Sequence, residues 1–155
     1  MKHAVEKEPV VTVQRILDSQ ETVERVHIAP DAKVRDVLSS LAFSNVGALV
    51  VSTDGDTVEG IISERDIVRG LKKVGAGLLD KPVKELMTEK VITCVATDRA
   101  AGIMAVMVSK HLRHVPVLED GKFVRMISIR DLLQLRLTEV QSEADAMRSY
   151  ISGGT

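Results

Sequence analysis

The feature that most constrains the fold of this chain is an internal repeat, because its 155 residues carry one pattern twice. The stretch Ser63–Asp66 follows an apolar run in the first half, and Ser128–Asp131 follows a similar run 65 residues later. Upstream, Ala48–Val51 matches Val115–Leu118 at an offset of 67, so two extra residues of the first half would fall in a turn. Units of about 60 residues cannot bury both of their faces alone. We therefore expect the two copies to pack against each other.

Each half predicts the same order of elements, β-α-β-β-α. A short β-branched strand, residues 25–28 or 91–95, precedes an amphipathic helix, and two strands joined at Asp-Gly form a hairpin before a second helix. The first helices have apolar residues at i, i+3, i+4 and i+7, which are Val34, Val37, Leu38 and Leu41 in one copy and Ala101, Met104, Ala105 and Val108 in the other. The second helices carry Ile67, Val68 and Leu71, or Leu132, Leu133 and Leu135.

The helix starts are also predicted in pairs. Pro30-Asp31 matches Thr97-Asp98 at the offset of 67, and the two aspartates stand where N-caps are expected.

The repeat divides the chain into parts. We predict an N-terminal extension (1–11), a first repeat (12–73), a linker with helix-breaking glycines (74–82), a second repeat (83–137) and a C-terminal helix and tail (138–155). The first repeat opens with a helix at 12–18 and the second with one at 83–87. We expect one shared core, with clefts at the boundary of the repeats. The tail has Val140, Ala144, Met147 and Ile151 at helical spacing, and it docks either on the module or on a second copy.

Composition and motifs argue against several classes of function. A net charge of −1 gives no field that would hold nucleic acid. No apolar run approaches the roughly 18 residues that span a bilayer, no signal peptide is visible, and the single Cys94 cannot form an intrachain disulfide, so the cytoplasm is the expected location. His111 and His114 are three residues apart, but no cysteine or carboxylate lies close enough to complete a metal site. Without a Gly-rich phosphate loop or a nucleophile beside a base, no enzyme is predicted.

In both copies a serine is followed three residues later by an aspartate, at the point where a strand meets a helix. This motif has two interpretations. It is a helix capping box, although such boxes favour Glu or Gln over the Asp found in both copies. Alternatively, the carboxylate of Asp66 or Asp131 accepts hydrogen bonds from both hydroxyls of a ribose, while the helix start favours a phosphate. Ser63 and Ser128 add hydroxyl donors, and capping and binding can coexist.

The positively charged side chains that could bind a phosphate are distributed unequally between the two copies. Arg65 and Arg130 either reach a cleft or remain in solvent. Arg113 and His114 lead into a strand of the second copy, whereas residues 44–47 of the first copy carry no positive charge, so the second cleft is the better phosphate site. If the ribose carries a purine, we expect the purine to lie against backbone groups near residues 26–28 or Ile92–Cys94, which we call the purine wall.

With these motifs, the sequence resembles the CBS-domain family, whose repeats end in Gly, two apolar residues, Ser or Thr, two variable residues and Asp. Gly60–Asp66 carries this pattern, as does Met126–Asp131 together with His114–Leu118, which resembles the family's second strand. The resemblance covers residues 12 to 137. It implies an α+β fold of two β-α-β-β-α CBS repeats packed with pseudo-twofold symmetry, called a Bateman module, with two clefts for ligands and pairing into a homodimer.

The resemblance implies AMP as the first ligand to expect, with ADP, ATP, S-adenosylmethionine and NAD(H) as others. The predicted function is a regulatory nucleotide sensor that acts on a separate protein. The alternatives are a structural dimerisation module without ligand and a small nucleotide-processing enzyme. The predicted binding residues are Ser63, Arg65, Asp66, Ile92, Arg113, His114, Ser128, Arg130 and Asp131.

The second copy departs from the pattern at two positions. Arg125 stands where the first copy has Gly60, and its side chain would pair with a phosphate, plug the cleft or point outward. Thr97 replaces the proline found at position 30.

Overall fold

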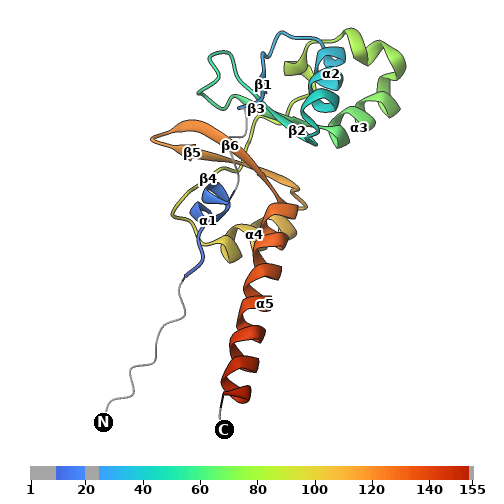
Figure 1. Cartoon of the computed structure of the whole chain (residues 1–155). Helices are drawn as coiled ribbons and strands as arrows, with labels where there is room; N and C mark the ends of the chain where they lie inside the picture. Colours follow the sequence, from blue (N-terminus) through green and yellow to red (C-terminus); the bar gives the residue numbers. More distant parts are fainter. Residues whose placement is uncertain (1–9, 20–24, 154–155) are drawn as a thin grey trace.

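The chain folds into two lobes, each built from a three-stranded sheet and its helices (Figure 1). The structure is a computed structural model that describes residues 10–19 and 25–153. It confirms the predicted α+β class and the β-α-β-β-α order of each half. The first lobe contains β1 (His27–Ile28), α2 (Val34–Ser44), β2 (Ala48–Val51), β3 (Gly60–Ser63) and α3 (Glu64–Val74). The second contains β4 (Cys94–Val95), α4 (Ala100–Ser109), β5 (His114–Glu119), β6 (Lys122–Ser128) and α5 (Ile129–Ser152).

Short helices open and connect the lobes. Helix α1 (Gln14–Asp18) precedes the first lobe, and the 3-10 helices η1 (Gly75–Asp80) and η2 (Val83–Glu85) lie between the lobes. Helix α3 ends at Gly75, whose φ of 67° is a conformation that glycine adopts without strain, so the predicted helix break is confirmed.

The sheets have the same topology. In each, the first strand pairs parallel with the second, and the second pairs antiparallel with the third. The turn between β5 and β6 is the predicted Asp-Gly hairpin, in which Asp120 and Gly121 have φ of 49° and 78°. The first hairpin instead has a long loop, in which the Asp54 carboxylate accepts hydrogen bonds from the backbone N–H groups of Asp56 and Thr57.

The register of the ladders corrects the alignment of the two copies. Ala48 pairs with Ser63 and His114 pairs with Ser128, so the counterpart of Ala48 is His114, at an offset of 66 rather than 67. The alignment slipped by one residue because β2 is buried along its whole length. A strand without an alternation of apolar and polar residues has no sequence signal that fixes its register.

The predicted N-caps of the first helix in each copy are also wrong. The N-cap residues of α2 and α4 are Lys33 and Arg99. Asp31 forms an ion pair with Lys84, with 2.6 Å between Oδ1 and Nζ, and Asp98 accepts a hydrogen bond from a backbone N–H in β4. A different carboxylate, Asp36, accepts a 3.0 Å hydrogen bond from the Lys33 N–H at the start of α2.

The first helix of each copy buries a face that only partly matches the predicted one. In α2, Val34, Val37 and Leu41 are buried as expected, but Leu38 is 40% exposed. In α4 the buried residues are Ala100 and Met107, whereas Ala101, Ala105 and Val108 of the predicted face are exposed. Helix α4 is apolar almost all round, so its periodicity cannot distinguish one face from another.

The molecule has two hydrophobic cores instead of the single shared core that we expected. The first consists of Ile28, Val34, Val37, Leu41, Leu49, Val51, Ile62, Ile67, Leu78 and Val83. The second consists of Val13, Ile16, Cys94, Ala100, Met107, Val115, Val117, Ile127 and Leu132. Val83 opens the second repeat but lies in the first core, and Val13 and Ile16 open the first repeat but lie in the second core. Each lobe is therefore completed by the opening segment of the other repeat.

Backbone hydrogen bonds fix this exchange. The N–H of Val83 donates to the carbonyl of Ala32 over 2.8 Å, and the N–H of Val13 donates to the carbonyl of Asp98 over 2.9 Å. The two bonds occupy equivalent positions in the two lobes, because Ala32 and Asp98 are related by the offset of 66.

The C-terminal segment continues the second repeat without a break. The predicted boundary at residue 138 lies within α5, a single helix of 24 residues. Figure 1 shows this helix leaving the second lobe and running away from it. Among the described residues, no helix combines the length and the hydropathy that crossing a lipid bilayer requires.

We predict that Ile16→Ala will lower the free energy of unfolding by about 2–5 kcal/mol, because it removes a buried side chain from the second core. Arg15→Ala is the matched control on the same helix, and as an exposed substitution it should change stability by less than about 0.5 kcal/mol. Urea denaturation measures both effects. Hydrogen exchange should accelerate mainly in α4 and β5 of the Ile16→Ala variant, and faster exchange confined to the first lobe would contradict the exchanged packing.

Candidate functional site

The two Ser-x-x-Asp turns lie where β3 meets α3 and where β6 meets α5. The Oδ2 atom of Asp66 accepts hydrogen bonds of 2.8 Å from both the N–H and the hydroxyl of Ser63. The Oδ2 atom of Asp131 accepts equivalent bonds from Ser128, of 2.7 Å from the N–H and 3.0 Å from the hydroxyl. Both motifs are therefore capping boxes, and the capping interpretation is confirmed for each copy.

Capping leaves these carboxylates able to bind more. In both aspartates the capping bonds end on Oδ2, and an ionised carboxylate offers about four lone-pair sites to donors. Asp66 and Asp131 are half-buried, so neither is sealed off from a ligand. Each also stands at the start of a helix, whose dipole favours a nearby anion.

The two lobes meet where the His114 ring packs on Gly47. A Cβ atom added at position 47 would lie 2.9 Å from Cε1 of His114, a distance that real Cβ contacts essentially never show. The Glu64 carboxylate lies beside the same point, and its backbone N–H donates to the Gly47 carbonyl. A second contact joins the lobes nearby, because Nη1 of Arg65 donates to the carbonyl of His111 over 3.1 Å.

Burial lowers the pKa of His114 below its ordinary value of 6.5. The negative charges of Glu64 and Asp131 act in the opposite direction, and the positive charge of Arg113 adds to the lowering. The ring is therefore mostly neutral near pH 7, and it can offer a phosphate a hydrogen bond but little charge. The positive charge that we expected at this end of the site is left to Arg113, which is exposed.

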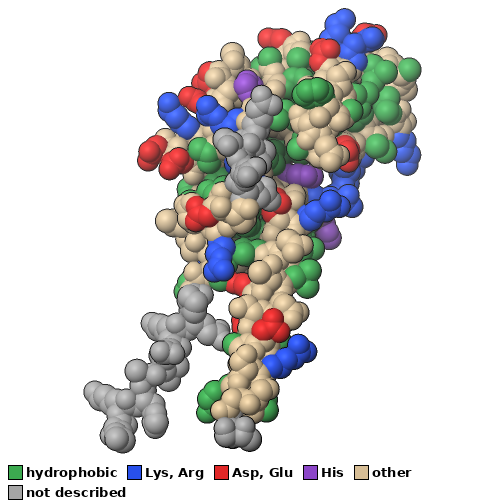
Figure 2. Space-filling model, in the orientation of Figure 1, with side chains coloured by type: hydrophobic (Ala, Val, Ile, Leu, Met, Phe, Trp, Pro, Cys, Tyr) green, Lys and Arg blue, Asp and Glu red, His purple; other side chains and the backbone are tan. Residues whose placement is uncertain are grey.

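Two other predicted site residues, Ile92 and Arg130, lie on exposed segments of the second lobe. Ile92 lies in the extended segment before β4 and is 37% exposed, and Arg130 is exposed at the start of α5. Figure 2 shows histidine, lysine and arginine side chains gathered on the visible face at the level where the two lobes meet.

Sequence reasoning missed two residues of this junction, Gly47 and Glu64. The only available signal was the alignment of the copies, which places Gly47 opposite Arg113 once the offset of 66 is used. The side chain that fills the space at Gly47 belongs to the neighbouring residue, His114.

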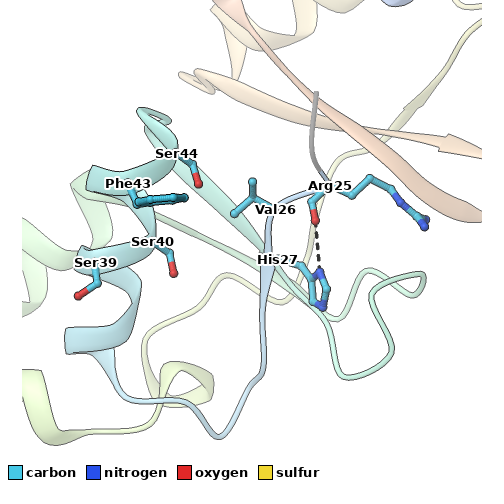
Figure 3. A pocket seen from close by; sticks show the side chains of 7 residues that line it. All are labelled: Arg25, Val26, His27, Ser39, Ser40, Phe43 and Ser44. Carbon is cyan, nitrogen blue, oxygen red and sulfur yellow. Dashed lines mark hydrogen bonds between the residues drawn. The ribbon is translucent and has the colours of Figure 1, made fainter. Parts of the chain in front are cut away.

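A pocket of about 610 Å³ lies elsewhere, between the start of β1 and the C-terminal half of α2. Its lining residues are Arg25, Val26, His27, Ser39, Ser40, Phe43 and Ser44. Figure 3 shows Val26 facing the side chains of α2, while the Arg25 side chain extends away from them. Two residues named for the purine wall, Val26 and His27, line this pocket, but Ser63, Asp66 and the other predicted site residues do not. The α2 residues were missed because that helix was read only for its apolar face.

Arg125 is the counterpart of Gly60, as predicted, because Val51 pairs with Gly60 and Val117 pairs with Arg125. In the first lobe, the missing side chain lets Met87 approach the strand, since a Cβ at position 60 would lie 2.6 Å from Sδ of Met87. Arg125 is half-buried, and its Nε is shielded from solvent. The stem of this side chain is therefore packed against the protein, and which of the three expected arrangements its charged end adopts stays a prediction.

No group of three or more His, Cys, Asp or Glu side chains in the described parts of the chain could hold a metal ion. Cys94 is 3% exposed, and burial raises the pKa of its thiol to about 12. The thiol is therefore protonated at neutral pH, and Cys94 fills space in the second core.

We predict that Gly47→Ala will destabilise the protein by about 1–3 kcal/mol, because the new methyl group displaces the His114 ring. Gly102→Ala is the control, because its Cβ meets only one atom, 4.0 Å away, and an exposed helical glycine replaced by alanine gains up to about 1 kcal/mol. Adding His114→Ala should restore part of the stability lost in Gly47→Ala. Equal losses in the single and double variants, measured by urea denaturation, would show that the ring and the glycine are not coupled.

The lowered pKa of His114 predicts a pH dependence. The folded state holds the neutral ring, whereas the unfolded chain takes up a proton below pH 6.5, so the stabilisation present above that pH is lost as the pH falls through it. The Tm of the parent protein should therefore fall more between pH 7.5 and 5.5 than that of His114→Gln. His27→Gln, at an exposed histidine, should keep the parent's pH profile. Identical profiles for all three proteins would contradict the assignment.

Comparison with known proteins identifies the family to which this duplicated fold belongs. The family model for the CBS domain matches residues 7–73 and 83–138. The mitochondrial CBS domain-containing protein CBSX3 of Arabidopsis thaliana is 34% identical over 128 residues, which cover 80% of this chain and 62% of that protein. The chain thus spans less than two thirds of that relative.

Solved structures agree. A CBS-domain containing protein from Agrobacterium tumefaciens is 32% identical, with a TM-score of 0.77 over 81% of this chain and 99% of that one. A CBS domain protein from Pyrobaculum aerophilum, complexed with AMP, is 27% identical, with a TM-score of 0.65 over 78% of this chain and 89% of that one. The duplicated sheets, the paired Ser-x-x-Asp turns and the two matches to the family model together show that this chain belongs to the CBS-domain family as a tandem pair of repeats.

Proposed function

We propose that the chain is a regulatory module that binds an adenine nucleotide, AMP first among the candidates, between its two CBS repeats. The observation that carries the proposal is that both repeats present a Ser-x-x-Asp turn at a helix start beside the contact between the lobes. The AMP complex of the Pyrobaculum aerophilum relative supports it, because that protein shares this fold.

The aspartates would bind the ribose. Asp66 and Asp131 are half-buried carboxylates at the two turns, and a carboxylate is the acceptor that suits the two hydroxyls of a ribose. A hydrogen bond to an ionised group is worth about 1.5–3 kcal/mol, so a ribose held in this way adds substantially to affinity. Ser63 and Ser128 would keep each carboxylate in place through the capping bonds and would add a hydroxyl beside the ligand.

The phosphate would lie toward the second turn. Arg113 is exposed and precedes His114 in the chain, and α5 begins beside it, because the Ile129 N–H donates to the Arg113 carbonyl. The positive end of the α5 dipole therefore lies at this end of the proposed site. Arg65 and Arg130 would supply further charge. Arg65 binds the His111 carbonyl in the structure, so its recruitment to a phosphate would break a contact between the lobes. That competition couples ligand binding to the arrangement of the repeats.

The purine would lie against backbone groups of an extended segment, with Ile92 as an apolar neighbour. Backbone N–H and carbonyl groups recognise the edge of adenine without requiring a particular side chain. The wall is therefore proposed from the position of Ile92 before β4 and from its partial exposure.

The regulatory role follows from the coupling between ligand and packing. A ligand shifts an arrangement only by as much as it prefers one state over another. We propose that a separate protein detects this shift and that the module carries out no chemistry of its own. We also propose a homodimer, because the described surface exposes large apolar side chains, among them Phe43 of α2 and Leu137 of α5, which are 90% and 64% exposed.

We predict that AMP will raise the Tm of the protein by mass action, and that Asp131→Ala and Asp66→Ala will each weaken binding at their own site at least about tenfold. Thermal shift with AMP, ADP, ATP, NAD, NADH and S-adenosylmethionine identifies the ligand, and calorimetry measures the two affinities.

Asp36→Ala is the matched control, because it also removes a carboxylate that caps a helix but lies outside the proposed site. It should lower the Tm by a similar amount without changing the affinity for the nucleotide. An unchanged Tm with every ligand would leave a purely structural dimerisation module, and turnover of the nucleotide during the assay would favour the enzyme alternative.

A further inference from the structure

Helix α5 carries a row of apolar side chains that no other described part of the molecule covers. Five of its members, Leu133, Leu137, Val140, Met147 and Ile151, are between 47% and 73% exposed. The sixth is Ala144, which is half-buried. The row, which we call the α5 seam, continues along the part of the helix that leaves the second lobe (Figure 1).

The seam is separate from the face with which α5 packs on its own lobe. Leu132 is buried in the second core, and Leu135 packs against that core. At about 100° per residue, Leu132 lies roughly 100° and Leu135 roughly 160° around the helix from the middle of the seam. A second helix could therefore lie along the seam without displacing the body of the molecule. The family model ends at residue 138, so most of the seam lies beyond the CBS repeats.

The spacing of the seam is that of a coiled coil. Its residues are separated alternately by four and three positions, which is the a and d pattern of a heptad repeat with a mean spacing of 3.5. Leu137, Ala144 and Ile151 occupy a positions, and Leu133, Val140 and Met147 occupy d positions. The remaining exposed positions of the helix are mainly polar, so the apolar stripe is narrow, as a two-stranded coiled coil requires.

We propose that α5 pairs with α5 of a second copy of this chain to form a parallel two-stranded coiled coil along the seam. This interface lies outside the nucleotide site, and it does not depend on whether a ligand binds there.

Charge complementarity favours a second copy in parallel orientation. Glu143 occupies a g position and Arg148 the e position five residues later, so each Glu143 would face Arg148 of the second copy. In an antiparallel pair with full overlap of the seams, Glu143 would face Glu143 of the second copy, and the like charges would repel. Within one chain, Arg148 contacts Asp145 at 3.6 Å on the exposed surface, which does not prevent an interchain pair.

The folded lobe makes so short a coil feasible. A helix of this length is marginal alone in water, because forming its first turn is unfavourable. Here the first turn is already formed, since the Ser128 and Asp131 cap fixes its start and Leu132 is buried in the core. The seam therefore needs to supply only the pairing of two preformed helices.

Disulfide cross-linking tests the orientation. In a parallel coil, position 144 of one copy lies opposite position 144 of the other, so Ala144→Cys should form a covalent dimer under mild oxidation at least about tenfold faster than Ser142→Cys, on the outer face of the same helix. The buried Cys94 stays in both variants, because its protonated thiol does not compete. Equal rates for the two variants, or a monomer in both, would overturn the proposal.

Self-association provides the second test. In sedimentation equilibrium, Leu137→Glu combined with Met147→Glu should weaken the dimer at least about tenfold, whereas Ser142→Glu with Ser149→Glu adds the same charge on the outer face and should leave it unchanged. Circular dichroism shows whether α5 remains helical. A parent protein that is monomeric, whether because its own N-terminus or a different protein covers the seam, would also overturn the proposal. The Tm shift caused by AMP should be the same in both double variants, so failure of the coil is distinguishable from failure of nucleotide binding.

Discussion

The structure depends on the exchange of two short segments between the repeats. Val83 completes the first core and Val13 with Ile16 completes the second, and backbone hydrogen bonds to Ala32 and Asp98 hold both segments in place. Neither repeat can therefore be complete without the other, although each has its own core. A rearrangement of one lobe relative to the other would therefore disturb these segments, and this is how the proposed ligand would affect the whole module.

The contact between the lobes is asymmetric although the fold is repeated. The His114 ring fills the space that Gly47 leaves, and burial keeps the ring mostly neutral near pH 7. Arg65 reaches across to the His111 carbonyl, and no equivalent contact is made by Arg130, which is exposed. The two proposed sites, which share one motif, thus have different surroundings. Different affinities for the charged part of a nucleotide are the expected result.

Local sequence pattern predicted the two capping turns well. The Ser63 and Asp66 turn and its copy were located from the sequence, together with the strand before each turn and the helix after it, because capping depends on residues only three positions apart. The register of β2 and the buried face of α4 could not be predicted, since a fully buried strand and an evenly apolar helix have no contrast between their faces. The pocket beside Phe43 could not be predicted either, because it lies between β1 and α2 and depends on how these two elements pack.

The sequence by itself determined the duplication, the order of the elements, the capping turns and the heptad spacing of α5, all of which rest on neighbours within a few positions along the chain. Only the tertiary structure decided which opening segment completes which core, that Gly47 lies under His114, and that α5 leaves the lobe with its seam uncovered. These depend on contacts between residues far apart in the chain. An apolar side chain can pack against many different apolar surfaces, so the need for burial does not by itself specify which segment packs against which core.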